Sequence, residues 1–250
     1  MRDWLRHHPN VRTIRVAAVD LNGQARGKRV PVRFADKIVK DGTRFPYSVL
    51  NLDIWGEDIE DSPLVFDTGK PFEGDPRHAL ANVVRRFHDR GLHPVCATEL
   101  EFYLIDDSGR ELRVPPSPRS GKRRLGADTL ALRALDAFDV FFTDLYEACE
   151  AMDIDADTWL FKQLVRGIAR KHGFAASFMA KPYPDWPGNG MHMHFSMNDD
   201  EGNNLFDDGS AKGADLMRNA VAGCMKAMPG SMLLLAPHAN SYERFVPGNH

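Results

Sequence analysis

An Asn-Gly dipeptide at residues 22–23 separates two runs rich in β-branched residues, and no other feature of the sequence restricts the fold as strongly. The runs span residues 11–20 and 24–32. Asn-Gly readily adopts the positive-φ conformations of the tight turn whose twist matches that of an antiparallel strand pair. The chain is therefore predicted to begin with an antiparallel hairpin, and we expect no helix before about residue 70.

Beyond the hairpin, helical and strand patterns follow one another without the regularity of βαβ units. Asp75-Pro76 is typical of a helix start, and apolar residues then recur at helical spacing up to Phe87. Further helices are predicted over residues 130–149, 161–168 and 215–228, and strands over residues 93–105, 175–180 and 191–197. This order predicts an α+β fold built on antiparallel strands.

The composition excludes several classes of protein. The 250 residues carry 32 basic and 35 acidic side chains, which argues against a dedicated nucleic-acid binder. No apolar run approaches the roughly 20 residues of a membrane span, and the first residues lack the apolar core of a signal peptide. Three widely spaced cysteines, Cys96, Cys149 and Cys224, are interpreted as reduced core thiols. We expect a cytoplasmic protein whose partners include neither nucleic acid nor a membrane.

Two short motifs could carry chemistry. Glu99 and Glu101 flank one residue in a predicted strand, and His192 and His194 do so in another. Because side chains alternate across a strand, each pair projects from a single face. Carboxylates and imidazoles together suit a divalent cation if the two strands are neighbours. Either pair taken alone is more typical of a solvated strand face, and both interpretations stay open at this point.

Basic side chains offer weaker candidates. Arg244 lies in a polar segment, where its guanidinium could hold a carboxylate or phosphate at two points, although a surface arginine is the more common outcome. Lys162, Arg166 and Arg170 form a row at helical spacing that we interpret as a solvated helix face.

Four segments of the chain are similar to glutamine synthetase, and they occur in the order found in that family. They cover residues 20–28, 99–104 (Glu-Leu-Glu-Phe-Tyr-Leu), 178–194 and 240–248 (Asn-Ser-Tyr-Glu-Arg-Phe-Val-Pro-Gly). The resemblance implies a small N-terminal β-grasp domain over residues 1–74. It implies a glutamine-synthetase-type catalytic domain over residues 75–250, with a curved antiparallel sheet and flanking helices. It also implies a homo-oligomer, a dodecamer of two stacked hexamers.

The same resemblance implies a reaction and a set of site residues. The phosphate of ATP is transferred to glutamate, and an amine then attacks the γ-glutamyl phosphate, with Mg²⁺ or Mn²⁺ neutralising the transferring charge. By this resemblance the metal ligands are Glu99, Glu101 and His192. The residues that contact ATP are His194 and Ser196. Glutamate is held by Gly188 and Arg244.

Two departures from the family pattern concern the amine, and a third concerns glutamate. Where ammonia-using members have an aspartate and a flap glutamate, this chain has the segment Phe45-Pro46-Tyr47-Ser48 and His250, and Pro187 stands where an asparagine usually contacts glutamate. A pocket without these anions binds ammonium poorly, because desolvating a cation requires paired charge. We therefore expect a glutamate–amine ligase similar to γ-glutamylpolyamine synthetases, acting on a polyamine or monoamine, with His250 as the base. The alternatives are an ammonia-using glutamine synthetase and a non-catalytic homologue with an incomplete metal site.

Stretches that the family normally carries are absent near residues 69–70, near residues 157–158 and after residue 250. By the resemblance, the stretch after Asp157 would carry two further metal-binding glutamates. We expect these stretches to exist in a longer natural chain, because each junction lies where an active-site loop would be.

Overall fold

The computed structural model describes residues 2–20, 23–45, 57, 75–109, 111–123, 132–154 and 157–245. Contacts within the chain divide it into two units, Met1–Arg90 and Gly91–His250. None of the helices within the described ranges combines the length and the apolar composition that a membrane span requires. The predicted domain boundary between residues 74 and 75 lies at the edge of a described range and stays a prediction.

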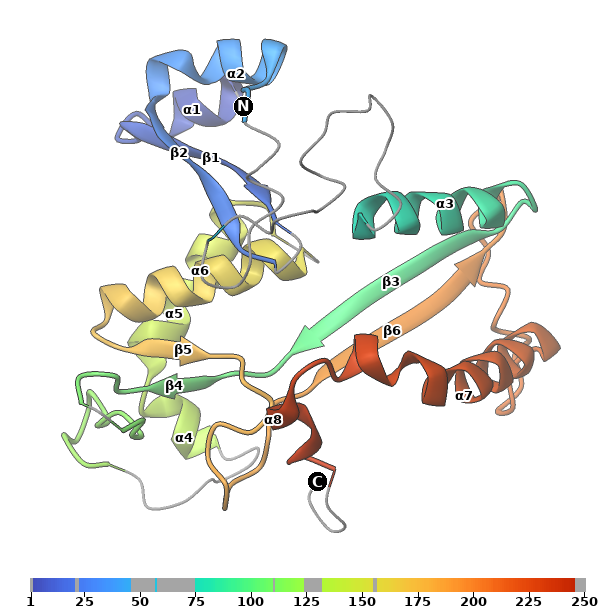
Figure 1. Ribbon diagram of the computed structural model, residues 1–250. Helices are drawn as coiled ribbons and strands as arrows, with labels where there is room; N and C mark the ends of the chain where they lie inside the picture. The colour runs from blue at the N-terminus through green and yellow to red at the C-terminus, as the bar shows by residue number, and fades with distance from the viewer. Residues whose placement is uncertain are drawn as a thin grey trace. The chain divides into compact units, whose positions relative to one another are not determined.

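The predicted hairpin is present in the first unit as β1 (Thr13–Val19) and β2 (Ala25–Pro31), which pair antiparallel from Thr13↔Pro31 to Val19↔Ala25 (Figure 1). Buried Asp20 fixes the turn, because its carboxylate accepts bonds from the Gln24 amide at 2.8 Å and from Arg26 Nε at 2.9 Å. Gly23 supplies a φ of 73°. Asn22 lies outside the described residues.

The expectation of no helix before residue 70 is wrong. The helices α1 (Arg2–His7) and α2 (Ala35–Asp41) flank the hairpin, and the 3-10 turn η1 (Val32–Phe34) precedes α2. Both helices have fewer than two full turns, so they carry no apolar period that could be recognised. Their signals are local instead: each has an aspartate in its first turn and a basic residue in its last turn, which suits the helix dipole.

The helix predicted at Asp75-Pro76 is confirmed as α3 (Pro76–His88). The Asp75 carboxylate accepts a bond from the Arg77 amide at 2.9 Å, and Pro76 occupies the first helical position.

In the second unit the strand predicted over residues 93–105 is divided in two. β3 (His93–Leu100) pairs antiparallel with β6 (Met191–Asn198), whereas β4 (Tyr103–Ile105) pairs antiparallel with β5 (Ala175–Ser177). The chain changes partner at Glu101 and Phe102. The Phe102 ring enters an aromatic cluster there, at 6.4 Å from Phe141 and 5.6 Å from Phe178 between ring centroids. Phe102 thus packs in the aromatic core at the point where one ladder ends and the next begins.

The core of this unit lies where α5 (Asp139–Ala151) and α6 (Thr158–Lys171) pack together and against β5. Its centre consists of four buried apolar side chains: Phe141, Leu145, Val165 and Ala169. The single helix predicted over residues 130–149 is two helices, because α4 (Leu132–Asp136) ends before Phe138, whose ring packs against Phe174. The Asp144 carboxylate joins α5 to the end of α6, since Lys171 Nζ lies at 2.6 Å and His172 Nε2 at 2.8 Å.

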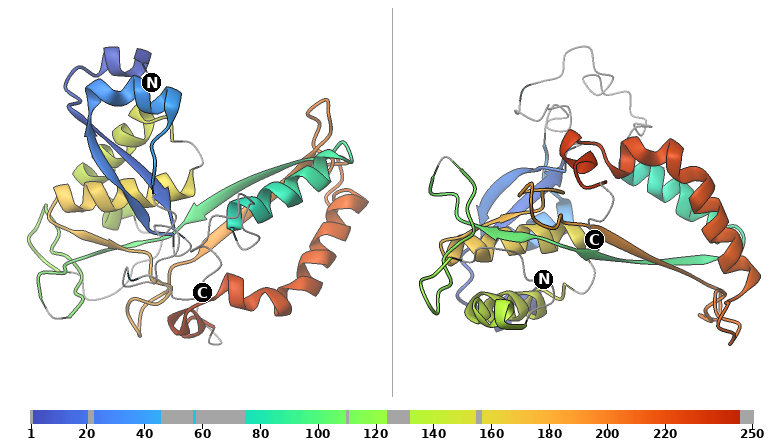
Figure 2. Two further views of the ribbon diagram at one scale, coloured as in Figure 1. Left: turned by 45° about the horizontal axis from the view of Figure 1, so that its top comes forward. Right: turned by 90° about the horizontal axis from the view of Figure 1, so that it is seen from below.

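The β3–β6 pair forms a ribbon that extends away from α5 and α6 in both views of Figure 2. The last part of the unit consists of α7 (Asp215–Leu235) and α8 (Ala239–Tyr242). α7 is longer than predicted, because it continues through Pro229 into three strongly exposed leucines, Leu233, Leu234 and Leu235.

Two interpretations of side chains need correction. Cys96 and Cys224 are free but exposed, so they are not core thiols; Cys149 is half-buried. The row on α6 is not wholly solvated either. Lys162 Nζ and the Arg166 guanidinium lie 5.3 Å and 5.4 Å from the centroid of the Phe178 ring, which packs on their side of the helix. Burial and the neighbouring Arg166 lower the pKa of Lys162.

Candidate active site

The β3–β6 ribbon brings the two predicted motifs onto one face. The register pairs Glu99 with His192 and Ala97 with His194, and residues directly opposite in an antiparallel pair point to the same side. The Glu99 carboxylate lies between both rings, 3.4 Å from His192 Nδ1 and 2.9 Å from His194 Nε2. All three side chains are more than half exposed. The pairing of β3 with β6 therefore meets the condition under which the two motifs could form one site.

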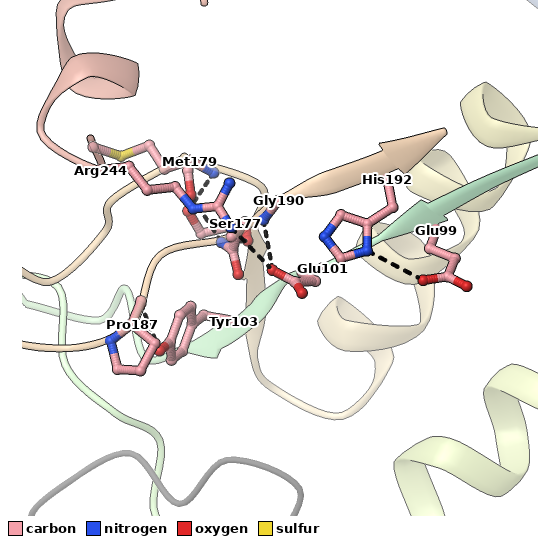
Figure 3. A network of polar contacts seen from close by, with 10 residues as sticks. Glu99, Glu101, Tyr103, Ser177, Met179, Pro187, Gly190, His192 and Arg244 are labelled. Carbon is pink, nitrogen blue, oxygen red and sulfur yellow. Dashed lines mark hydrogen bonds and ion pairs between the residues drawn. The ribbon is translucent and has the colours of Figure 1, made fainter. Parts of the chain in front are cut away.

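Glu101 lies just beyond the end of β3 and is held differently from Glu99. The Gly190 amide donates a bond of 2.6 Å to Glu101 Oε2, and the Glu101 amide donates one of 3.1 Å to the Gly190 carbonyl. Arg244 Nη2 lies 4.0 Å from the same carboxylate oxygen. Figure 3 shows the Glu101 carboxylate turned toward Gly190 and Arg244, while Glu99 is turned toward His192.

The segment between β5 and β6 is fixed at several points by hydrogen bonds. The buried Asn189 side chain donates to the carbonyl of Met179 at 2.8 Å and to that of Ser177 at 3.3 Å. Tyr103 donates its hydroxyl hydrogen to the Pro187 carbonyl at 2.9 Å. Burial and the nearby Glu101 carboxylate raise the pKa of Tyr103, so the hydroxyl keeps this proton. The sequence analysis did not identify Tyr103 or Asn189 as anchoring residues. The one available signal was the run Gly188-Asn189-Gly190, in which Asn189 has the only side chain between two glycines.

Gly188 and Gly190 lie against the side chain of Arg244. A Cβ atom on Gly188 would stand 2.4 Å from the Ala180 carbonyl and 2.8 Å from Arg244 Cδ. A Cβ atom on Gly190 would stand 2.9 Å from Arg244 Nη2. Both positions therefore require glycine while Arg244 keeps this place. Arg244 is not a surface arginine, because its side chain is only 35% exposed.

The donors on this face have the chemistry of a divalent-cation site. Two carboxylates and two imidazoles suit Mg²⁺, Mn²⁺ or Zn²⁺. Within the described ranges, however, no group of three or more histidine, cysteine or acidic side chains is arranged to hold one ion. Glu99 contacts the imidazoles, and Glu101 contacts the Gly190 amide and Arg244. The donor types fit a divalent ion, and Glu99 is the carboxylate that contacts the imidazoles of both His192 and His194.

Of the remaining predicted residues, Ser196 lies within the described ranges and His250 does not. Ser196 lies opposite Val95, on the same ribbon face as His192 and His194. His250 and the residues 46–48 lie outside the described ranges. Of that earlier segment only Phe45 is described, and Lys28 Nζ lies 5.5 Å from its ring centroid.

Comparison with known proteins yields one family. The model of the glutamine synthetase catalytic domain matches residues 73–160 and 155–250. γ-Glutamylputrescine synthetase PuuA of Escherichia coli is 32% identical over 313 aligned residues, which cover 99% of this chain and 66% of that protein. A glutamine synthetase of Thermococcus kodakarensis is 30% identical, over 96% of this chain and 62% of its own. This chain thus spans slightly less than two thirds of either relative.

Two further similarities extend the comparison. A glutamate–isopropylamine ligase of a Pseudomonas species is 25% identical, over 98% of this chain and 67% of its own. A solved structure described as a GmaS/ADP complex matches 97% of this chain and 66% of its own with a TM-score of 0.72, at 24% sequence identity. At that identity the structural match concerns the fold, and the fold is the mixed arrangement of helices and antiparallel strands described above.

Proposed function

This chain belongs to the glutamine synthetase family, and on that premise we propose that it is an ATP-dependent ligase joining the γ-carboxylate of glutamate to an organic amine through γ-glutamyl phosphate. The observation that carries the proposal is the place of Arg244. Its guanidinium lies at the junction of the ribbon and the core, against two glycines and beside Glu101. A guanidinium held there can grip a substrate carboxylate at two points.

The proposed glutamate-binding and ATP-binding residues lie at different places along the ribbon face. At the Arg244 end, the backbone at Gly188 and the guanidinium bind and orient glutamate. Further along β6, His194 and Ser196 face the ATP phosphates. Glu99, Glu101 and His192 would hold divalent ions, Mg²⁺ or Mn²⁺, which neutralise charge on the phosphates when bound. A carboxylate is a poor acyl donor, so the phosphate serves as the leaving group when the amine attacks, and we assign His250 as the base that takes the amine proton.

Two observations support an organic amine. The chain has Phe45-Pro46-Tyr47-Ser48 and His250 where the resemblance places the aspartate and the flap glutamate of ammonia-using members. Two of the similar proteins are named for organic amines, putrescine and isopropylamine. An ammonia-using enzyme remains the runner-up, because another relative is a glutamine synthetase.

A second candidate function rests on the metal donors. Since no three donors of the described part converge on one point, the chain could be a non-catalytic member of the family that binds nucleotide or metal without turnover. The assay that separates these functions is phosphate release from ATP with glutamate and one of putrescine, isopropylamine or ammonium. Release that depends on putrescine or isopropylamine supports the ligase. Release only with ammonium supports glutamine synthetase, and Mn²⁺ binding without release supports the non-catalytic homologue.

The finer assignments are also proposals. The β1–β2 hairpin supports a β-grasp domain over residues 1–74, and the exposed leucines at the end of α7 support contact with another subunit. We propose the dodecamer that the resemblance implies. The free thiols support a cytoplasmic location. Segments missing near residues 69–70 and 157–158 are supported in two ways. The family match comes in two pieces that meet at residues 155–160, and the PuuA alignment of 313 residues is longer than this chain of 250.

A further inference from the structure

Asn240, at the start of α8, forms a two-way hydrogen bond with the backbone of a residue far away in the sequence. Its Oδ1 accepts a bond of 2.8 Å from the Lys181 amide, and its Nδ2 donates one of 2.9 Å to the Lys181 carbonyl. A side-chain amide that satisfies both backbone groups of one residue fixes distance and orientation together. The same Nδ2 has a longer contact of 3.4 Å with Glu243 Oε2 inside its own turn.

Lys181 transmits this constraint to the segment that ends at Gly190. Its side chain is buried, and its ammonium group donates a bond of 2.7 Å to the Trp186 carbonyl. The next carbonyl, that of Pro187, accepts the Tyr103 bond, and the Asn189 amide donates to the Ala180 carbonyl at 2.8 Å. A buried cation that lost its carbonyl partner would be left unsatisfied, so this anchoring is costly to break.

The two anchored segments meet at Arg244, four residues after Asn240. Gly188 and Gly190 come from the Lys181 segment, and the clearance between their backbones and the Arg244 side chain leaves no room for a methyl group. A shift of one segment by an ångström would therefore move Arg244 away from Glu101 or drive it into backbone.

We propose that Asn240 is a positioning residue of the site: through Lys181 it holds the Gly188–Gly190 turn in register with Arg244, so that the guanidinium stands ready for a carboxylate. This role rests on the proposed function for its catalytic consequence. The positioning itself concerns only the backbone and can be measured without turnover.

The experiment compares the wild-type chain with Asn240→Ala and Asn240→Asp. Asn240→Ala removes both bonds to Lys181, while Asn240→Asp keeps the acceptor and loses the donor. Glu243→Gln is the matched control, because it changes the neighbouring contact of Asn240 and leaves the bonds to Lys181 intact. The first readout is hydrogen exchange at the Gly190 amide, which donates to Glu101. The second is KM for glutamate against KM for ATP in the phosphate-release assay.

We expect Asn240→Ala to speed exchange at Gly190 and to raise KM for glutamate about tenfold, the scale of one or two lost hydrogen bonds, with KM for ATP unchanged. Asn240→Asp should lie between Asn240→Ala and the wild type in exchange rate, and Glu243→Gln should match the wild type. Unchanged exchange at Gly190 overturns the proposal whatever the activity, and faster exchange with an unchanged glutamate KM overturns the catalytic consequence. A wild-type chain without glutamate-dependent phosphate release instead contradicts the proposed function, and the exchange rates still decide the positioning.

Discussion

Glu101 and Gly190 exchange two hydrogen bonds: the Gly190 amide donates to the Glu101 carboxylate at 2.6 Å, and the Glu101 amide donates to the Gly190 carbonyl at 3.1 Å. This exchange closes the ribbon at the point where the chain changes from β3 to β4. It sets one carboxylate of the Glu99/Glu101 pair at the ribbon base and turns it toward Arg244. The two glutamates are consequently not equivalent, although the sequence presents them as a symmetric pair.

Gly190→Ala tests the close approach of Arg244. The new Cβ atom would meet Arg244 Nη2 at 2.9 Å, so the guanidinium must move. We expect kcat/KM for glutamate to fall by about 100-fold, the scale of an ångström-sized misplacement, while the folded state persists. Gly223→Ala on α7 is the control, since nothing lies within 4 Å of its Cβ position. Equal activity of both variants would contradict the crowding.

Arg244→Ala should lower kcat/KM for glutamate by a factor that corresponds to about 2 kcal/mol of lost transition-state stabilisation, because a half-buried charge contact to substrate is lost. Arg244→Lys should recover only part of this, since an ammonium group cannot bind a carboxylate with two parallel bonds. Steady-state kinetics with varied glutamate measure both effects. Kinetics like those of the wild type in Arg244→Ala would remove this residue from the substrate site.

Glu101→Ala should abolish metal-dependent ATP turnover if Glu101 holds an ion. Glu101→Gln separates charge from structure, because its amide oxygen can still accept the Gly190 bond while the negative charge is gone. We expect both variants to lose turnover and to weaken Mn²⁺ binding in calorimetry. Glu150→Gln, at an exposed position near the end of α5, is the matched control. Full turnover in Glu101→Gln would show that its negative charge is not needed.

Asp144 gives a prediction about stability and pH. Hydrogen bonds from Lys171 and His172 lower the pKa of Asp144 below its ordinary value of 3.8. The ionised group therefore stabilises the folded state above about pH 4, and this contribution disappears as the pH falls through the lowered pKa. Asp144→Asn should lower Tm by a few degrees at pH 7, and the difference should vanish in strong acid. Asp107→Asn, at an exposed turn, should change Tm little at either pH, and an equal effect of the two variants would refute the assignment.

The sequence predicted correctly what depends on local patterns. The hairpin followed from its turn residues, the start of α3 from Asp75-Pro76, and the common face of His192 and His194 from strand alternation. That Glu99 lies on the same face depends on the register of β3 and β6, which the sequence does not show. The two short helices of the first unit were not predicted, because fewer than two turns show no recognisable apolar period.

Features that depend on long-range packing could not be predicted from the sequence. Glu99-Leu100-Glu101 is an alternating strand motif, and the sequence does not show that β3 ends at Leu100 or that Phe102 packs in the aromatic core. Likewise, Lys162 and Arg166 have the spacing of a solvated row, and the sequence does not show that the Phe178 ring packs against them. In both cases the deciding neighbour is distant in the sequence.

The two ends of the ribbon described above lie in different surroundings. Near Glu101 its backbone joins the aromatic core, whereas its other end, near His93 and Asn198, extends away from α5 and α6 (Figure 2). If the ribbon bends, the displacement of a residue grows with its distance from the aromatic core. Arg244 and Glu101 lie near the aromatic core, while His194 and Ser196 lie further along β6, where bending of the ribbon would displace them more. If the proposed function holds, such bending would move the residues assigned to ATP and leave those assigned to glutamate in place.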